Sequence, residues 1–287
     1  MTRLFVRITR DNLPKVKDRY PFLYLEKGRL NIDDSSLKWV SGAGDVIRLP
    51  VATISCIMLG PGTSVTHEAV KVAAASNCML LWVSEDSLVF HAAGQSPTAT
   101  TSNIRHQAKL SSLPSKSIVI ARKMFSKRFP DVDVSAKNLK ELMGMEGSRV
   151  KKLYEEKANE YGVGWQGRRH TPGNFKMGTT TNKLLTAYNQ SLYGIVSSCI
   201  HALGYSPHLG FVHSGSPLPF VYDIADLYKG DVSIDLAFKV TKEMAGMYDR
   251  EIAVTRFREK ILEMGLLNKI PSDILELLGG KDAGRYC

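Results

Sequence analysis

The sequence predicts an α+β protein in which an N-terminal β-rich domain is followed by a larger all-α domain. From residue 21 to about residue 90 the apolar residues mostly alternate with polar ones, and β-branched and aromatic residues are frequent, which is typical of strands. Beyond residue 104 the apolar residues recur with the period of helices. The polar segment GQSPTATTSN at 94–103 has the composition of a linker. We therefore expect domains at 1–95 and 104–287, joined by a linker at 96–103.

The N-terminal domain should contain several short strands and one helix. Turn-like breaks at Lys27–Gly28, Asp33–Ser35 and Ser41–Gly44 interrupt the apolar pattern. Thr66 is suited to cap a helix over Thr66–Ser76, because its hydroxyl can accept a hydrogen bond from the first turn. The expected strands are Phe22–Leu25, Leu37–Val40, Val46–Leu49, Thr53–Met58, Met79–Val83 and Leu88–His91.

The C-terminal domain should be a set of helices joined by short breaks. The strongest pattern runs over Thr181–Leu203, where Leu184, Tyr188 and Leu192 begin an apolar stripe along one face. Pro271 is typical of a helix start, so the last helix is expected to begin there. The expected helices cover Ile104–Leu110, Ser115–Phe129, Ala136–Met143, Gly147–Tyr161, Thr181–Leu203, Val232–Gly246, Asp249–Met264 and Ser272–Leu278.

A glycine-rich break at 162–181 does not fit a compact helical domain, since loops of this length are commonly functional. Its glycines alternate with Trp165, Arg168, Arg169 and Phe175. Arginines beside aromatic residues suit a loop that grips a nucleic-acid strand, with guanidinium groups on phosphates and rings against bases. The alternative is a surface loop whose Trp165 simply packs onto the domain.

Charge and cysteine content narrow the function classes. The chain has 38 Lys plus Arg against 28 Asp plus Glu, which gives a net charge of +10. This charge is equally consistent with a protein that binds a polyanion such as nucleic acid and with a basic protein that has no such partner. The four cysteines show no CxxC spacing, which argues against a zinc cluster and a disulfide scaffold. With no signal-peptide pattern and no apolar run of about 18 residues, we expect a soluble protein of the reducing cytoplasm, without membrane attachment.

The stretch from Phe211 to Asp226 places an imidazole ten residues before a pair of carboxylates. Asp223 and Asp226 are spaced i, i+3, so a helix that begins near Asp223 would place both acids on one face. Carboxylates that face a protein interior beside His213 need positive charge, and a divalent cation is the natural candidate. Taken singly, the two aspartates could instead cap a helix, and His213 could be an ordinary core or surface histidine.

Glu146 lies between Gly144 and Gly147 at an expected helix start, where glycines would let the backbone approach closely and leave the carboxylate unshielded. Taken alone, it is better explained as a first-turn acid that complements the helix dipole than as a ligand. Combined with His213, Asp223 and Asp226, it completes a set of hard oxygen ligands and one imidazole. Such a set favours Mg²⁺ or Mn²⁺ and leaves coordination positions open for phosphate and water. An ion held there could polarise a phosphodiester.

The chain resembles the CRISPR-associated spacer integrases, the family of the universal Cas protein one, and its type I-E branch in particular. The resemblance is carried by LGPGTSVTHEAV (59–70), ARKMFSKRF (121–129), GMEGSRV (144–150), YGVGWQGRR (161–169) and GFVHSGSPLPFVYDIADL (210–227). It implies an N-terminal β domain that dimerises and a helical catalytic domain. It also implies that Glu146, His213 and Asp226 bind the divalent metal and that Asp223 supports the site. Several type I-E relatives have arginine where this chain has Ser64.

The resemblance further implies an endonuclease that joins the 3′-OH ends of protospacer DNA to the repeat of a CRISPR array in antiviral defence. Members act as homodimers bridged by a small dimeric partner, Cas protein two. The alternatives are a stand-alone metal-dependent repair nuclease and a non-catalytic DNA-binding scaffold whose acids only cap helices. The candidate phosphate contacts are Lys71, Arg122, Lys123, Lys127, Arg128, Arg149, Lys151, Lys152, Arg168, Arg169 and Arg250, each of which could instead be a solvated surface charge.

Overall fold

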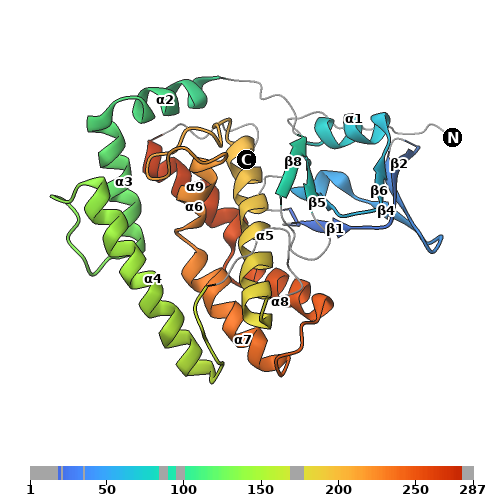
Figure 1. The fold of residues 1–287 in the computed structure, drawn as a ribbon. Helices are drawn as coiled ribbons and strands as arrows, with labels where there is room; N and C mark the ends of the chain where they lie inside the picture. Colours follow the sequence, from blue (N-terminus) through green and yellow to red (C-terminus); the bar gives the residue numbers. More distant parts are fainter. Residues whose placement is uncertain are drawn as a thin grey trace.

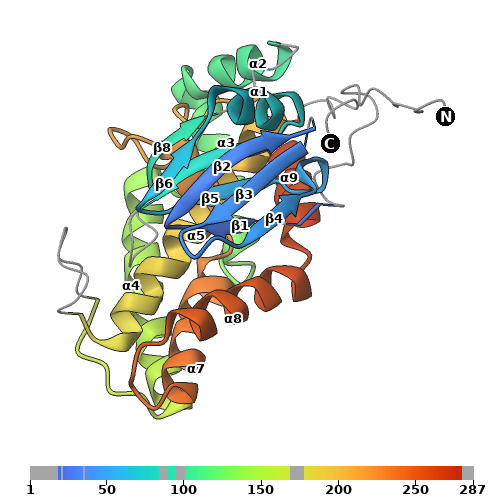
Figure 2. The same cartoon turned by 90° about the vertical axis from the view of Figure 1, so that its right-hand side faces the viewer.

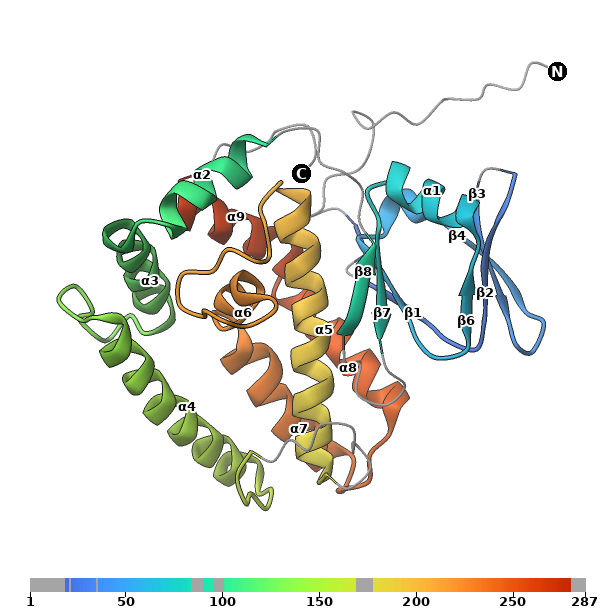
Figure 3. The same ribbon diagram turned by 45° about the horizontal axis from the view of Figure 1, so that its top comes forward.

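A computed structural model describes residues 19–20, 22–34, 36–83, 90–94, 101–168 and 178–279. The fold is α+β, with an N-terminal β region followed by a larger helical region, which confirms the predicted class (Figure 1). The long helix α5 (Thr180–Ala202) lies between the strands and most of the other helices of the C-terminal region (Figures 1 and 3). In the described part of the chain, no helix combines the length and the apolar character needed to cross a bilayer.

The strands form two four-stranded sheets that face each other (Figures 2 and 3). The first sheet has the order β1-β5-β7-β8, in which β1, β5 and β7 are parallel and β8 is antiparallel. The second has the order β4-β3-β2-β6. The strands are β1 (Leu23–Leu25), β2 (Gly28–Asp33), β3 (Ser36–Ser41), β4 (Val46–Leu49), β5 (Cys56–Leu59), β6 (Thr63–Val65), β7 (Met79–Val83) and β8 (Phe90–Gly94).

The first sheet is covered on both faces, so its inner strand β5 is apolar and buried throughout. Ile57 and Leu59 point toward the second sheet and α1 (His67–Ala75), where they join one hydrophobic cluster. Cys56 and Met58 point the other way and belong to the large cluster of the helical region. The N-terminal sheet therefore forms one wall of the main core.

The helical region is built around α5, which is buried along most of its length. It packs against α6, α7 and α9 on one side and against β5 on the other. The remaining helices are α2 (Ser102–Ser111), α3 (Pro114–Arg128), α4 (Leu139–Tyr161), α6 (Pro219–Ala225), α7 (Asp235–Glu243), α8 (Arg250–Glu263) and α9 (Leu266–Leu278), with a π-helical turn at Gly230–Ile234 before α7.

Close approach of α5 to the sheet depends on Gly194. A Cβ placed there would lie 2.8 Å from Cδ1 of Leu81 and 3.0 Å from Cε of Met58, so a larger residue would force these side chains to move. Four residues further along α5, the hydroxyl of Ser198 donates a hydrogen bond of 3.2 Å to the carbonyl of Ser55. An ion pair of 2.7 Å between Arg250 of α8 and Glu26 adds a second link between the two regions.

The structure differs from the sequence-based expectation at several elements. Strands β2 and β6 were not predicted, and the expected helix break between Met143 and Gly147 is wrong, because α4 continues through it. The last helix begins at Leu266, so Pro271 lies within it. Most of the predicted linker lies outside the described residues, and its last two positions, Ser102 and Asn103, already belong to α2.

Candidate metal centre

The centre begins with Asp223, whose carboxylate organises the loop before α6. Pro219 starts that helix at a position where a missing N–H has no consequence, and Asp223 lies one turn further on. Its Oδ2 accepts hydrogen bonds from the backbone N–H groups of Phe211 (2.6 Å) and Val212 (3.2 Å), and its Oδ1 accepts one from the N–H of His213 (2.9 Å). A buried carboxylate that accepts from three backbone donors fixes the loop.

His213 is oriented by the same carboxylate. Its Nδ1 lies 2.8 Å from Oδ1 of Asp223, and because an ionised carboxylate can only accept, Nδ1 carries the proton. Nε2 then points toward Asp226, with 3.7 Å between Nε2 and Oδ2. The hydrogen bond to Asp223 raises the pKa of His213 above its ordinary value, although partial burial works in the opposite direction.

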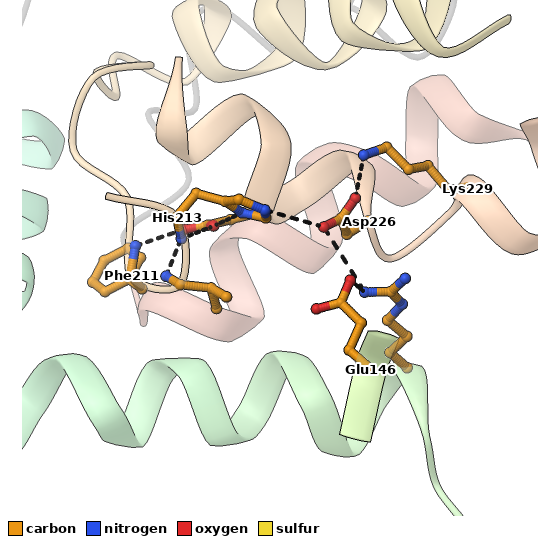
Figure 4. Close-up of polar contacts among 8 residues, drawn as sticks. Glu146, Phe211, His213, Asp226 and Lys229 are labelled. Carbon is orange, nitrogen blue, oxygen red and sulfur yellow. Dashed lines mark hydrogen bonds and ion pairs between the residues drawn. The ribbon is translucent and has the colours of Figure 1, made fainter. Parts of the chain in front are cut away.

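Asp226 follows the last residue of α6 and is surrounded by positive groups (Figure 4). Its Oδ1 pairs with Nζ of Lys229, and its Oδ2 lies 3.8 Å from Nη1 of Arg128. Burial of Lys229 opposes its charge, but the carboxylate of Asp226 more than offsets this effect and raises the pKa of the ammonium group. Asp226 thus has its charge balanced by side-chain cations.

Glu146 reaches the centre from the middle of α4, so the interpretation of it as a first-turn acid at a helix start is wrong. Gly144 and Gly147 meet no close neighbours, and the expected close backbone approach is absent at both of these described positions. Oε1 of Glu146 lies 2.5 Å from Nη1 of Arg128. The same guanidinium therefore connects Glu146 to Asp226.

The structure brings all four predicted acidic and imidazole residues together, from α4, the loop at 211–213 and α6. Among the described residues, however, no three carboxylate, imidazole or thiol groups are already arranged to hold an ion. Arg128 stands between Glu146 and Asp226 and contacts both carboxylates.

The residues nevertheless fit a divalent cation. Two carboxylates share the positive charge of Arg128, and an imidazole faces one of these carboxylates. The imidazole has its Nδ1–H held by Asp223, an arrangement in which Nε2 is left free to bind a metal. The expectation that Asp223 and Asp226 only cap helices is not met. Asp223 lies inside α6, and its carboxylate oxygens accept hydrogen bonds from the backbone of the preceding loop.

Two members of the centre were not singled out as such from the sequence: Lys229, and Arg128 in the role of a counter-charge. Lys229 follows Asp226 by three residues, a spacing that could have predicted the pair. Arg128 was predicted only as a phosphate contact. Its distance of 18 positions from Glu146 gives no local signal.

The other candidate phosphate contacts are spread over the molecule, and many have partners within it. Lys123 and Lys151 are exposed, whereas Arg168 is partly buried and donates to the side chains of Asn182 (2.9 Å) and Thr186 (2.9 Å). Arg169 lies outside the described residues. The remaining pairs are Lys71 with Glu68, Arg122 with the carbonyl of Lys137, Lys127 with Asp273 and Glu276, Arg149 with Asp131, Lys152 with Glu156, and Arg250 with Glu26. Their contact with DNA stays a prediction.

Of the glycine-rich loop, the structure describes 162–168 and Gly178 onward. Trp165 stacks on Tyr154 with 5.0 Å between ring centroids and meets Phe238 edge-on at 5.1 Å. This placement agrees with the alternative in which Trp165 packs onto the domain.

The chain matches one protein-family model and several relatives over most of their length. The family model described as CRISPR associated protein Cas1 matches residues 125–245. The chain is 58% identical over 279 residues to CRISPR-associated endonuclease Cas1 2 of Chlorobaculum tepidum, covering 97% of this chain and 94% of that protein. It is 38% identical over 237 residues to CRISPR-associated endonuclease Cas1 of Escherichia coli, covering 83% and 78%. The crystal structure of a TtCas1–DNA complex superposes with a TM-score of 0.81 at 32% identity, covering 91% of this chain and 93% of that one.

Proposed function

The chain belongs to the CRISPR-associated Cas1 family, and we propose that it is a metal-dependent DNA endonuclease that also joins protospacer ends into a CRISPR repeat. One observation carries the proposal: Glu146 and Asp226 share the guanidinium of Arg128, and Nε2 of His213 faces the same Oδ2 of Asp226. Relatives that match nearly the whole chain are named endonucleases, and a structural relative was crystallised with DNA. The net charge of +10 suits a DNA substrate.

Mg²⁺ or Mn²⁺ is the proposed cofactor, held by carboxylate oxygens of Glu146 and Asp226 and by Nε2 of His213. When bound, such an ion supplies charge stabilisation at a phosphodiester and lowers the pKa of a water or hydroxyl group. Hard oxygen donors with one imidazole suit these ions, and a thiol-rich zinc site is not formed by these residues.

The residues around these ligands hold them in position. Asp223 fixes both the backbone and the ring of His213, so Nε2 keeps its direction toward Asp226. Lys229 and Asp226 form a pair that orients the carboxylate. Positioning of this kind contributes much of the rate enhancement when a DNA 3′-OH or a water molecule attacks a phosphate, because the reacting atoms are held within reach.

The assembly is proposed to be a homodimer formed through the N-terminal domain, at 1–95, and bridged by the small dimeric Cas protein two. The helical domain at 104–287 would then present its metal centre to the protospacer end and the repeat. We place this activity in the cytoplasm, in keeping with the described cysteines, Cys56, Cys78 and Cys199, which are buried free thiols.

The test uses purified protein with a labelled DNA that has free 3′-OH ends and a supercoiled plasmid that carries a repeat. Reactions contain Mg²⁺ or Mn²⁺ and Cas protein two, and they are repeated with chelator and with the variants His213→Ala and Asp226→Ala. We expect labelled plasmid with the wild-type protein and none with either variant or with chelator.

Other outcomes would change the assignment. Cleavage of DNA without joining would support a stand-alone repair nuclease. Equal products from wild type and both variants would exclude the metal centre and leave a DNA-binding scaffold whose acids are structural.

A further inference from the structure

Arg128 contacts both Glu146 and Asp226, although it comes from α3, whereas Glu146 comes from α4 and Asp226 directly follows α6. Its Nη1 lies 2.5 Å from Oε1 of Glu146 and 3.8 Å from Oδ2 of Asp226. The side chain is 13% exposed, and its guanidinium carbon lies 5.1 Å from the ring centroid of Phe129. One cation thus contacts two of the three proposed metal ligands.

The position of Arg128 follows from charge balance. Glu146 and Asp226 are 18% and 11% exposed, and two partly buried carboxylates that share a site repel each other unless positive charge lies between them. Lys229 balances Oδ1 of Asp226, whereas Arg128 faces Oδ2. That same Oδ2 faces Nε2 of His213, so it is the oxygen that a shared metal ion would need.

The contact can be released without moving the helices. Arg128 is the last residue of α3, and its long side chain can swing away while the backbone stays fixed. The preceding residue, Lys127, holds this end of α3 to α9, with 2.9 Å between its Nζ and Oδ1 of Asp273. Departure of the guanidinium would leave two carboxylates that a divalent ion could then bridge.

We propose that the Arg128 guanidinium and the divalent cation are alternative occupants of the same carboxylates, so that Arg128 competes with the metal for Glu146 and Asp226. The inference rests on the proposed metal centre. In the metal-free protein Arg128 stabilises the acidic cluster, and each metal-binding event first breaks its pair with Glu146. Arg128 therefore sets a threshold metal concentration for the enzyme.

The experiment measures Mn²⁺ binding to the full-length protein, without DNA, by the loss of the electron paramagnetic resonance signal of free Mn²⁺. Wild type is compared with Arg128→Gln, and Asp226→Asn serves as the variant without a ligand. The matched control is Arg149→Gln, which removes the same charge from α4 one turn from Glu146 but breaks the exposed pair with Asp131 and the contact with the Phe129 ring and, among the described residues, no contact with a proposed metal ligand. Thermal unfolding of each protein is followed with and without Mn²⁺.

We expect Arg128→Gln to bind Mn²⁺ at least about tenfold more tightly than wild type, because a charge-assisted hydrogen bond no longer has to be broken. Arg149→Gln should match wild type within about twofold, since its charge is screened by solvent. Without metal, Arg128→Gln should melt below wild type, and Mn²⁺ should raise its melting temperature by more than it raises that of wild type.

Each other result has one meaning. Unchanged or weaker Mn²⁺ binding in Arg128→Gln, with normal binding in wild type, would overturn the competition and make Arg128 a residue that positions Glu146. Binding that is absent in every protein would overturn the metal centre itself, and the competition with it. Equal tightening in Arg149→Gln would show a general charge effect and overturn the specific role of Arg128.

If Arg128→Gln does not fold, wild type alone still tests the proposal. The arginine Nη–H groups, which include the group paired with Glu146, are followed by ¹⁵N nuclear magnetic resonance during a titration of wild type with Mg²⁺, and Arg128→Lys serves only to assign the Arg128 signal. Competition requires that this signal lose its protection from solvent exchange as Mg²⁺ binds. A signal that stays protected at saturating Mg²⁺ would overturn the proposal.

Discussion

Asp223, inside α6, and Asp226, directly after it, are three residues apart, yet their carboxylates are held in opposite ways. Asp223 accepts from three backbone N–H groups and from the ring of His213, all of which are fixed by the chain itself. Asp226 faces the ends of long side chains, Lys229 and Arg128, and an imidazole at 3.7 Å. The carboxylate of Asp223 therefore stabilises the fold, whereas Asp226 has partners that a ligand can replace.

The strongest test of this contrast is Asp226→Asn. We expect DNA cleavage to fall to the level seen with chelator, because the amide is a poor ligand for a divalent ion. The fold should be kept, since the remaining carbonyl oxygen can still accept a hydrogen bond from Lys229. Cleavage assays and circular dichroism check the two parts, and a variant that unfolds would remove the distinction between the aspartates.

Asp223→Ala should have the opposite effect, in that it lowers the stability of the fold. It leaves the N–H groups of Phe211, Val212 and His213 without their acceptor, and each unsatisfied buried group costs about 1–3 kcal/mol. We expect the free energy of unfolding to drop by about 3 kcal/mol or more, measured from urea denaturation midpoints without metal. A midpoint like that of wild type would mean that water replaces the carboxylate and that the loop does not depend on it.

An intermediate case is Asp273, which is held by one side-chain hydroxyl and one cation. Its Oδ2 accepts from the hydroxyl of Tyr228 at 2.5 Å, and its Oδ1 pairs with Lys127 at 2.9 Å. Lys127→Gln should therefore lower the free energy of unfolding by only about 1 kcal/mol, because the hydroxyl remains as a donor. A loss as large as that of Asp223→Ala would show that side-chain cations can be as important as backbone amides.

The smallest effect is expected for Glu26, whose described donors are both side chains, Arg250 and Tyr24. Partial burial opposes its ionisation, but the hydrogen bonds from Arg250 and Tyr24 outweigh it and lower the pKa of Glu26. A lowered pKa gives stability that is present at neutral pH and is lost as the pH falls through the folded-state value, below the ordinary 4.5.

The Glu26→Gln variant isolates the pH-dependent contribution of Glu26 to the free energy of unfolding. Wild type should lose up to about 1 kcal/mol more than Glu26→Gln when the pH is lowered from 7 to 3, as seen in paired urea titrations. Parallel pH profiles for the two proteins would show that the pair between Glu26 and Arg250 contributes nothing to stability.

Local patterns in the sequence predicted the elements with strong apolar periodicity. The helix capped by Thr66 and the long helix α5 were predicted within one or two residues of their observed ends. Strand β2 was missed because only Leu30 and Ile32 are apolar in it and its ends are turn-forming residues. It exists because it pairs with β3 on one side and β6 on the other, which no local pattern reveals.

The helix break expected at Gly144–Gly147 failed for a related reason. Each glycine weakens a helix by about 1 kcal/mol, but α4 is started by a capping box between Asn138 and Glu141 and is held by packing against α7. For the centre itself, the spacing of Asp223 and Asp226 predicted that both acids lie on one face of a helix that begins near Asp223. The helix instead begins at Pro219 and ends at Ala225, so Asp223 lies inside it and Asp226 directly follows it. The positive charge that balances Glu146 could not be predicted, since Arg128 reaches it only through the packing of α3 on α4.

The burial of α5 has a consequence for local opening of the protein. A helix that packs on the sheet through Gly194 and on α6, α7 and α9 cannot open while either side remains in place. Its central amides should therefore exchange with deuterium only when the whole molecule unfolds, as slow-exchanging cores do. The exchange rate of the Val196 amide would then report the global unfolding of the protein. The faster exchange rates of the outer helices can be compared with it.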